Sequence, residues 1–402
     1  MRSSSKAVEN GLIVSVTDRC ADVADSWRQL ETSGAATPFQ TYSFVSTLLE
    51  TVGVEQGAVP RIVVVSDDAG TPQMILPLVL FHLNGARVLT SPDFKVVDYF
   101  APVMAKSFAE QLTPARFAEL WRTIQAIVGD SDVVDFPKMP AMVEGVPNPL
   151  LHLGTKVHET AFLADFAGGL EAYESQLSKS FLSSLKRKER MLGRQGKVAF
   201  STASSTVQAI EIAQTMINFK SKRYRSTGVR DLFDEPAYRD FYEKLAEREW
   251  GNLVHLSSLS FEDEPMAVSL SVSRGGVLFL VMPAFDLDRF QKGSVGLQYI
   301  HSLCGWACAN HYQSLDFTWG DEAYKFSWVN RSVPLHRCRY PVTARGRLHC
   351  GSANAVEWTR GALKTAISAN PVLLSGAKML RKRLNGVTSP FNGRALSSRS
   401  EP

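Results

Sequence analysis

The segment 315–328 brings ionisable and aromatic groups together within a short stretch of chain. An apolar and acidic run ends at Trp319-Gly320 and is followed by two carboxylates, a tyrosine and a lysine. Groups that bind or transform a ligand tend to gather on loops held by a rigid scaffold, and this pattern predicts such a loop. A solvated acidic turn after an ordinary strand is the alternative interpretation.

Four residues of this loop, Asp321, Glu322, Tyr324 and Lys325, are predicted to be catalytic. A carboxylate can take a proton from an attacking amine, directly or through water, and either acid is a candidate for this base. Tyr324 is expected on the next helical turn, where it stays protonated at neutral pH and can donate to a leaving thiolate. A lysine can neutralise a phosphate or anchor a carboxylate. The structural alternatives are acids that cap a helix, a half-buried tyrosine and a surface ion pair.

Two further pairs are predicted to contact the substrate. Asp316 belongs to the strand that leads into the loop and Trp319 follows it, and Asp98-Tyr99 follows an expected strand in the first half of the chain. Asp98 and Tyr99 would line a groove between the two halves. A core tyrosine beside a turn aspartate explains the same pair without a ligand.

A small-residue turn opens the helix expected at 295–310. It comprises Gln291, Lys292, Gly293, Ser294, Val295 and Gly296. Small residues let backbone N–H groups approach a ligand closely, and a helix N-terminus favours phosphate through its unpaired donors and its dipole. The pattern alone favours a plain glycine-rich helix start, and a turn that binds the phosphate of a ligand is the alternative.

The elements that must hold these residues indicate an α/β (α+β) fold. In the second half, strands are expected at 253–261, 266–273 and 277–285, joined by tight turns, followed by the helix at 295–310 and a strand at 314–317. This is an antiparallel meander followed by a helix and another strand. A charged helix is expected at 170–192. The first half alternates strands and helices in the same manner, with a hairpin at 61–83 and a helix at 113–128.

Composition places the chain among soluble globular proteins, with 402 residues, 45% hydrophobic and 21% charged. The net charge of +4 is concentrated after residue 377, where six basic residues face one acid. The remaining chain is close to neutral and gives no reason to expect DNA binding. Five cysteines without framework spacing indicate a reducing compartment and no metal site. With no signal peptide and no long apolar run, we expect a cytoplasmic protein.

The order of strand, glycine-rich turn, apolar helix and strand with acidic end resembles the GNAT acyltransferase fold. In that family the turn carries Gln/Arg-x-x-Gly-x-Gly/Ala, and Ser294 stands here in the first glycine place. The resemblance implies acyl-CoA as co-substrate, with no permanently bound cofactor. It also implies that a backbone N–H of the strand 278–283 holds the acyl carbonyl. Pro283 has no N–H, and it is expected to mark where this strand separates from its neighbour.

The chain further resembles the two-domain acyltransferases linked to bacterial cellulose and exopolysaccharide synthesis, which are similar to Fem-type aminoacyl transferases. The resemblance covers residues 20–345. The segments that carry it are 37–40, 75–78, 98–99, the basic helix 186–190 before Gly196, and 316–325. It implies tandem GNAT-like domains, each a mixed sheet with an antiparallel meander flanked by helices. The expected boundaries are 1–165, 166–350 and a tail of helix and disordered basic chain at 351–402.

The resemblance implies N-acyl transfer from acyl-CoA to an amine of a sugar, amino acid or lipid precursor, in envelope or exopolysaccharide biosynthesis. Two alternatives stay open: an aminoacyl-tRNA donor, and a non-catalytic accessory protein of a membrane polysaccharide or lipid synthesis complex. The basic C-terminal segment could hold the protein at the inner membrane or at such a complex. The basic helix is either a solvated face or a contact for CoA phosphate, a sugar nucleotide, a tRNA acceptor stem or anionic lipid.

Overall fold

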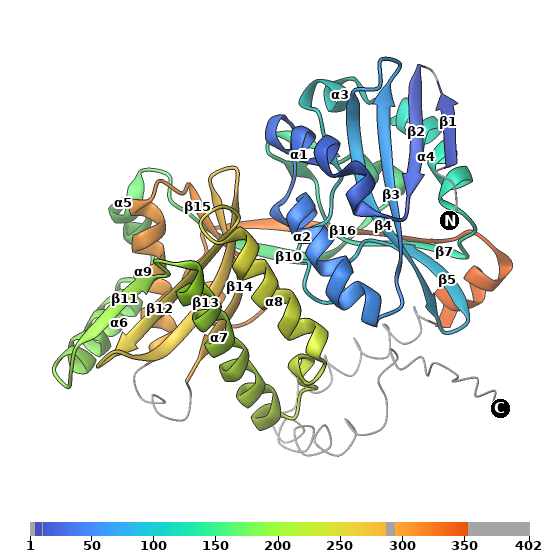
Figure 1. The fold of residues 1–402 in the computed structure, drawn as a ribbon. Helices are drawn as coiled ribbons and strands as arrows, with labels where there is room; N and C mark the ends of the chain where they lie inside the picture. The colour runs from blue at the N-terminus through green and yellow to red at the C-terminus, as the bar shows by residue number, and fades with distance from the viewer. Residues whose placement is uncertain (1–4, 10, 287–293, 353–402) are drawn as a thin grey trace, which may run out of the picture.

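The protein structure is a computed structural model, and it describes residues 5–9, 11–286 and 294–352. A mixed sheet of 14 strands runs through both halves of the chain (Figure 1). Its path is β1-β2-β3-β4-β5-β7-β16-β10-β15-β14-β13-β12-β11, with β6 paired to β4. A separate two-stranded ribbon, β8-β9, lies outside it.

The N-terminal strands are β1 (Ser5–Glu9), β2 (Leu12–Thr17), β3 (Val59–Asp67), β4 (Pro72–Leu83), β5 (Ala86–Thr90), β6 (Val103–Met104), β7 (Val133–Pro140), β8 (Met142–Val143) and β9 (Val146–Pro147). The later strands are β10 (Lys156–Asp165), β11 (Val198–Thr202), β12 (Val254–Phe261), β13 (Glu264–Arg274), β14 (Val277–Phe285), β15 (Ser314–Trp319) and β16 (Arg331–Pro341). The α-helices are α1 (Ala24–Ser33), α2 (Tyr42–Leu48), α3 (Lys106–Gln111), α4 (Pro114–Val128), α5 (Gly169–Gln176), α6 (Lys179–Gly193), α7 (Thr206–Thr227), α8 (Pro236–Glu249) and α9 (Val295–Ala309).

The two halves repeat one order of elements. The N-terminal half runs β2, α1, α2, then the antiparallel strands β3-β4-β5, then α3, α4 and β7, which is parallel to β5. The C-terminal half runs β11, α7, α8, then β12-β13-β14, then α9 and β15, which is parallel to β14. Each half therefore has a meander flanked by helices, and the predicted tandem α/β arrangement is confirmed.

Strands β10 and β16 are exchanged between the halves. β10 follows the N-terminal half in sequence and pairs with β15, whereas β16 follows the C-terminal half and pairs with β7. The two exchanged strands also pair with each other, antiparallel. They join the two half-sheets into one sheet. The strand at 156–165 was not predicted from the sequence.

The apolar core has three main parts. One lies between the halves and contains side chains of α1, α2, α7 and α8 with the sheet residues that they cover. Phe44 of α2 and Phe241 of α8 meet there with ring centroids 5.3 Å apart. Helix α4 covers the other face of the N-terminal half-sheet, and α5, α6 and α9 cover the other face of the C-terminal one. The first of these parts encloses the predicted groove residues.

Three details of the sequence predictions were wrong. The helix expected at 170–192 is two helices, because Leu177 and Ser178 are extended and Ser178 caps α6 with its hydroxyl. Residue Tyr324 does not follow on an α-helical turn but precedes the short 3-10 turn Lys325–Ser327. Strand β14 was expected to separate from its neighbour at Pro283, but its pairing with β15 already ends at Phe279. The predicted tail from residue 353 onward lies outside the described residues.

Candidate active site

Strands β14 and β15 separate partway along their length. Their parallel register covers only Val277 to Phe279 on β14, and β15 offers no register partner beyond Phe279. Next to this point β14 carries a bulge, since Leu270 of β13 is opposite Met282 while Ser271 is opposite Leu280. The extra residue is Val281. A bulge bends its strand, which explains why the opening begins at Phe279 and not at Pro283.

The four predicted substrate-contacting residues meet beside this opening, and they connect the two halves. The Tyr99 hydroxyl donates to Asp316 Oδ2 over 2.6 Å, and Trp319 Nε1 donates to Asp98 Oδ1 over 2.7 Å. The second oxygen of Asp316 accepts from the backbone N–H of Thr318 at 2.7 Å. Two residues of each half therefore form one polar cluster inside the protein.

The segment 37–40 holds Tyr99 in place, which explains its part in the sequence pattern. The ring of Phe39 stacks on Tyr99 with centroids 6.0 Å apart, and Gln40 Nε2 donates to the Tyr99 carbonyl oxygen at 2.9 Å. Phe279 of β14 meets the same tyrosine edge-on at 5.5 Å. The tyrosine is thus fixed from both halves.

Burial makes both carboxyls of the cluster weak acids. Asp316 is 2% exposed, and burial raises its pKa to about 7 despite the hydrogen bonds from Tyr99 and Thr318. Burial raises the pKa of Asp98 to about 6, with the Lys138 ammonium opposing that rise. Asp98 is only half-buried by its accessible surface, so it can meet a ligand. The two groups repel each other electrostatically and titrate as a pair close to neutral pH.

Lys138 supplies the positive charge on the N-terminal side. Its Nζ lies 2.9 Å from Asp93 Oδ2, donates to the Val97 carbonyl at 2.6 Å and sits 4.7 Å from the centre of the Trp319 ring. These contacts fix the ammonium against the same tryptophan that donates to Asp98. A cation over an aromatic face is attracted by the ring quadrupole, which further orders the cluster.

The predicted catalytic loop lies at the end of β15. Lys325 is 2% exposed, and its Nζ donates to the Trp319 carbonyl oxygen at 2.8 Å and pairs with Glu322 Oε2 at 2.9 Å. Asp321 and Glu322 are exposed, and Tyr324 is half-buried. Burial, with the Glu322 carboxylate, raises the pKa of Tyr324 above its ordinary value. Lys325 therefore connects the loop to the buried cluster, and it lowers the pKa of both Asp98 and Asp316.

Lys220 is a site residue that the sequence analysis missed. It lies on α7 and is half-buried; burial and the neighbouring Arg223 lower its pKa to about 8, while Glu322 acts in the opposite direction. The charges of Glu322 and Arg223 also act on the pKa of Tyr324, Glu322 raising it and Arg223 lowering it. Helix α7 thus brings two cations to the predicted loop. A lysine in the middle of a long helix belongs to no motif. Only the packing of α7 shows that Lys220 lies near the predicted loop.

The predicted phosphate turn lies at the end of β14, next to the opening. Ser294 is left-handed, with φ 50°, and stands just before α9. Lys188 of α6 donates to its hydroxyl at 2.6 Å. Gly296 lies close to Phe285, where an added Cβ would be 3.2 Å from the ring. Val295 is buried, and Gln291, Lys292 and Gly293 lie outside the described residues.

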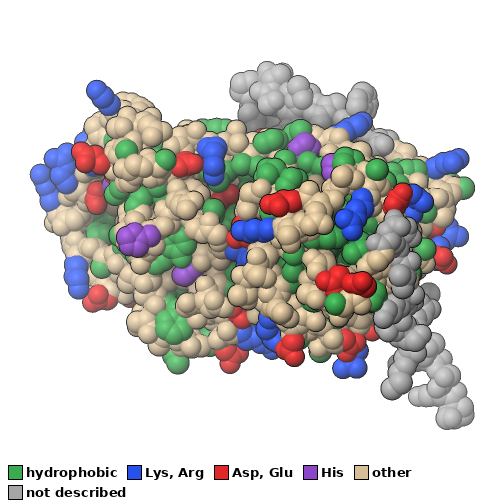
Figure 2. Space-filling model, turned by 90° about the horizontal axis from the view of Figure 1, so that it is seen from above, with side chains coloured by type: hydrophobic (Ala, Val, Ile, Leu, Met, Phe, Trp, Pro, Cys, Tyr) green, Lys and Arg blue, Asp and Glu red, His purple; other side chains and the backbone are tan. Residues whose placement is uncertain are grey.

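Basic side chains gather at the end of the molecule where α6 lies. Figure 2 shows several Lys and Arg side chains at this end, with a few acidic side chains among them. A positive face beside the N-terminus of α9 favours an anionic ligand there. Among the described residues, no group of acidic, histidine and cysteine side chains could hold a metal ion. None of the described helices is both long and apolar enough to cross a bilayer.

Comparison with known proteins agrees with this geometry. Residues 179–326, from the start of α6 through the predicted loop, match the family model described as an acetyltransferase (GNAT) domain. This segment has the pattern of a GNAT acetyltransferase domain. Its bounds include both the turn before α9 and the carboxylate loop after β15. A comparison with curated protein sequences gives no match.

Two solved structures share the fold over most of the chain. The C-terminal domain of a protein assigned as a lysylphosphatidylglycerol synthetase from Agrobacterium fabrum has a TM-score of 0.52 and 12% identity. It covers 84% of this chain and 98% of its own. FemX has a TM-score of 0.56 and 11% identity, covering 84% of this chain and 97% of its own. At such identities the likeness concerns the fold, which both halves of the chain share with these proteins.

Proposed function

We propose that the protein is an N-acyltransferase that moves an acyl group from acyl-CoA to an amine of a sugar, amino acid or lipid precursor. The observation that carries the proposal is the Asp98-Tyr99-Asp316-Trp319 cluster beside the opening between β14 and β15. The helix N-terminus suited to phosphate follows β14 at the same end. A carboxyl whose pKa lies close to neutral, as that of Asp98 does, suits proton removal from an amine.

In this proposal the acceptor amine loses a proton to Asp98 as it attacks. The amine nitrogen bonds to the thioester carbonyl carbon, and the carbon–sulfur bond breaks with its electron pair on sulfur. Tyr324, which is protonated at neutral pH as an ordinary tyrosine is, gives a proton to the thiolate and regains one from solvent. A backbone N–H of β14 near the bulge at Val281 would hold the carbonyl oxygen. Asp316 orients Tyr99 and stays out of direct contact with substrate because it is buried.

The loop residues have separate proposed roles. Lys325 holds the end of β15 through Trp319 and places a positive charge beside both buried carboxyls. Glu322 pairs with the buried Lys325 and raises the pKa of Lys220, and Lys220 is the cation that would meet a phosphate or carboxylate on the acceptor. Asp321 is exposed, and its predicted role as the base competes with that of Asp98. The N-terminal half contributes Asp98 and Tyr99, so the acceptor would bind between the halves.

Donor binding would use the turn 291–296 and Lys188. Isothermal titration with acetyl-CoA and with a long-chain acyl-CoA tests this. We expect Lys188→Gln to weaken binding about tenfold, the effect of one charge-assisted hydrogen bond. Gly296→Leu should abolish binding, since any side chain there meets the Phe285 ring. Lys179→Gln, which removes the same charge at the exposed first residue of α6, should have no effect.

Failure of both CoA esters to bind the wild-type protein would refute the proposed donor. An aminoacyl-tRNA would then be the first donor to test, because the fold is shared with a protein assigned as a lysylphosphatidylglycerol synthetase. If that donor also failed, a non-catalytic role in a membrane polysaccharide or lipid synthesis complex would be left. We place the reaction in envelope or exopolysaccharide biosynthesis, with peripheral membrane contact through the basic residues after 377.

A further inference from the structure

A groove between α7, the 3-10 turn Leu232–Asp234 and α8 lies outside the candidate active site. It encloses ≈ 370 Å³. Its lining residues are Thr215, Asn218, Phe219, Ser221, Lys222, Arg225 and Arg239. Three of these are cations and three carry hydroxyl or amide groups, and none of the described lining residues is a carboxylate. This composition favours an anion.

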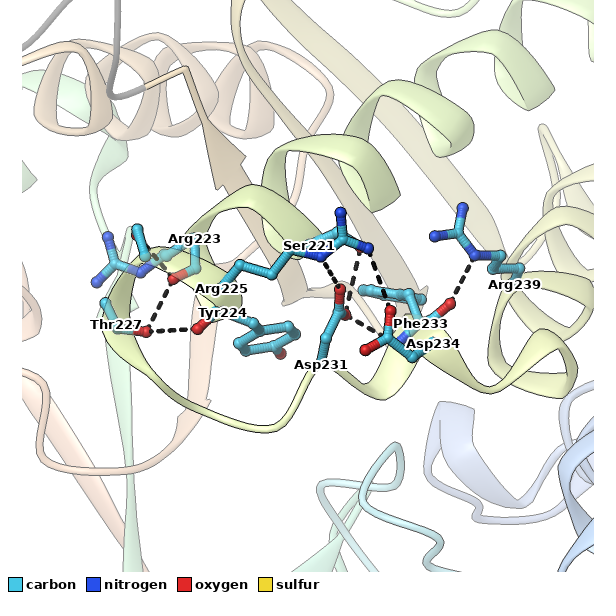
Figure 3. A network of polar contacts seen from close by, with 10 residues as sticks. Ser221, Arg223, Tyr224, Arg225, Thr227, Asp231, Phe233, Asp234 and Arg239 are labelled. Carbon is cyan, nitrogen blue, oxygen red and sulfur yellow. Dashed lines mark hydrogen bonds and ion pairs between the residues drawn. The ribbon is translucent and has the colours of Figure 1, made fainter. Parts of the chain in front are cut away.

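Two arginines of the groove are anchored from outside it (Figure 3). Arg239 Nε donates to the Phe233 carbonyl oxygen at 2.6 Å. Arg225 lies 3.4 Å from Asp231 and 3.1 Å from Asp234. In Figure 3 both guanidinium groups extend to the same side of the turn. Anchoring through one part of a guanidinium leaves its other N–H groups available in a fixed orientation, which reduces the entropy lost on binding.

The turn that anchors these arginines is itself fixed by a buried carboxylate. Asp231 has a side chain only 2% exposed and accepts from Ser221 Oγ at 3.2 Å and from the Phe233 N–H at 3.0 Å. The turn and α7 are therefore joined directly beneath the groove. The arrangement is built into the fold and does not depend on flexible surface side chains.

The charge balance leaves two cations for a ligand. Asp231 and Asp234 offset Arg225. Arg239 is held by an uncharged carbonyl, and Lys222 is exposed with no hydrogen-bond or ion-pair partner in the parts of the chain that the structure describes. Two uncompensated positive charges, with Asn218 and Thr215 beside them, match a phosphate dianion better than a single carboxylate.

We propose that this groove binds the terminal phosphate of a small phosphate ester or diphosphate. The cations are confined to one compact groove and do not form the extended positive track that a nucleic-acid strand requires. Helix α7 presents Lys220 and Arg223 toward Glu322, while the groove residues Thr215, Lys222 and Arg225 follow a different face of the same helix. The phosphate site is thus separate from the acceptor groups and from the turn before α9.

Isothermal titration of the full chain with inorganic phosphate, pyrophosphate and ADP at low salt tests the proposal. We expect saturable binding of at least one of them, weakened about tenfold by Lys222→Gln and by Arg239→Gln. Lys222 is exposed and has no hydrogen bond or ion pair among the described residues, so Lys222→Gln should leave the fold intact. This variant tests binding even if loss of the hydrogen bond to Phe233 unfolds Arg239→Gln. Lys244→Gln, on another face of α8, should bind like the wild type.

The same titration separates this groove from the proposed donor site. Lys188→Gln should leave pyrophosphate affinity unchanged, and Lys222→Gln should leave acyl-CoA affinity unchanged. The proposal is overturned if none of the three probes binds at about 10 mM, a concentration above which affinities are too weak to be specific. Unchanged pyrophosphate affinity in Lys222→Gln would also overturn it. So would a short RNA that binds the wild type more tightly than pyrophosphate does and no longer binds Lys222→Gln.

Discussion

Asp316, which accepts from Tyr99, and Asp98, which accepts from Trp319, titrate under two opposing effects. Each donor favours the ionised carboxylate, while burial favours the protonated acid, and burial is the larger effect at both residues. The result is a pair of carboxyls that change charge close to neutral pH. Such a pair is suited to moving a proton at the pH of a cell.

Asp98→Asn should lower kcat by about a hundredfold or more and change KM little, because it removes the proposed base and keeps the shape of the site. In the wild type, kcat/KM should rise with pH up to about 6, where Asp98 becomes ionised, and then level off. The variant should lack this rise. Steady-state kinetics across pH 5 to 8 measures both effects. A larger loss in Asp321→Asn than in Asp98→Asn would assign the base to Asp321.

Asp316→Asn should change how stability depends on pH. Because the folded pKa lies above the ordinary 3.8, the folded state binds more protons than the unfolded state between about pH 4 and pH 7. The wild type therefore loses stability as pH rises through this window. Between pH 5 and pH 8 the variant should lose about 2–3 kcal/mol less stability than the wild type.

Urea denaturation at the two pH values measures this difference. Asp68→Asn, in an exposed turn between β3 and β4, is the matched control and should follow the wild type. An unchanged pH dependence in Asp316→Asn would mean that the carboxyl is ionised inside the protein throughout the range.

Sequence patterns identified many of these side chains but not their partners. Asp98, Tyr99, Asp316 and Trp319 were predicted as ligand contacts, and the structure brings all four together. Their mutual hydrogen bonds depend on packing between halves more than 200 residues apart, which no local pattern encodes. Lys220 carries no motif, and the basic helix 186–190 gave no sign that Lys188 of that helix would meet Ser294. Their importance comes from what α7 and α6 pack against.

At the scale of elements, the bulge at Val281 and the short register of β14 with β15 open the sheet where the site lies. The sequence predicted the opening from Pro283, the residue without an N–H. The register instead ends at Phe279, because an extra residue in β14 bends the strand before the proline is reached. Bulges depend on cross-strand pairing and leave no reliable signal in one strand alone.

The end of α1 is a second place where backbone geometry restricts the sequence. A Cβ at Gly34 would lie 2.7 Å from the Leu30 carbonyl oxygen and would also overlap the Met104 carbonyl oxygen. The Met104 backbone is held in place by an antiparallel bridge to Ala35. Gly34→Ala should therefore lower the free energy of unfolding by about 2 kcal/mol. Gly193→Ala, at the end of α6 with open space around it, should leave stability unchanged or slightly higher. Chemical denaturation of the two variants side by side checks the prediction.

For the whole molecule, the exchange of β10 and β16 makes each half depend on the other. The fold class and the repeated order of elements were predictable from the alternation of strands and helices and from the resemblance. The exchange was not, because a strand's pattern indicates which face is buried and not which strand is its neighbour. The division at residue 165 stays a prediction, and it would cut the chain between the two exchanged strands.

A fragment of residues 1–165 should therefore aggregate when expressed alone. It would keep β7 but lack β16, so the edge of β7 would be left unpaired. Co-expression with a fragment of residues 166–402 should give a soluble complex, because β16 would again pair with both β7 and β10. Size-exclusion chromatography distinguishes these outcomes. A monomeric, folded 1–165 fragment would contradict the prediction.

The same exchange sets an order of events during synthesis on the ribosome. The partner of β7, residues 331–341, is made about 190 residues after β7 itself. At translation rates of about 5–20 residues per second, the nascent N-terminal half waits roughly 10–40 seconds with an open strand edge. The protein is consequently exposed to misassembly mainly while it is being made. We expect its yield in cells to depend on chaperones that shield nascent chains more than on the stability of the finished fold.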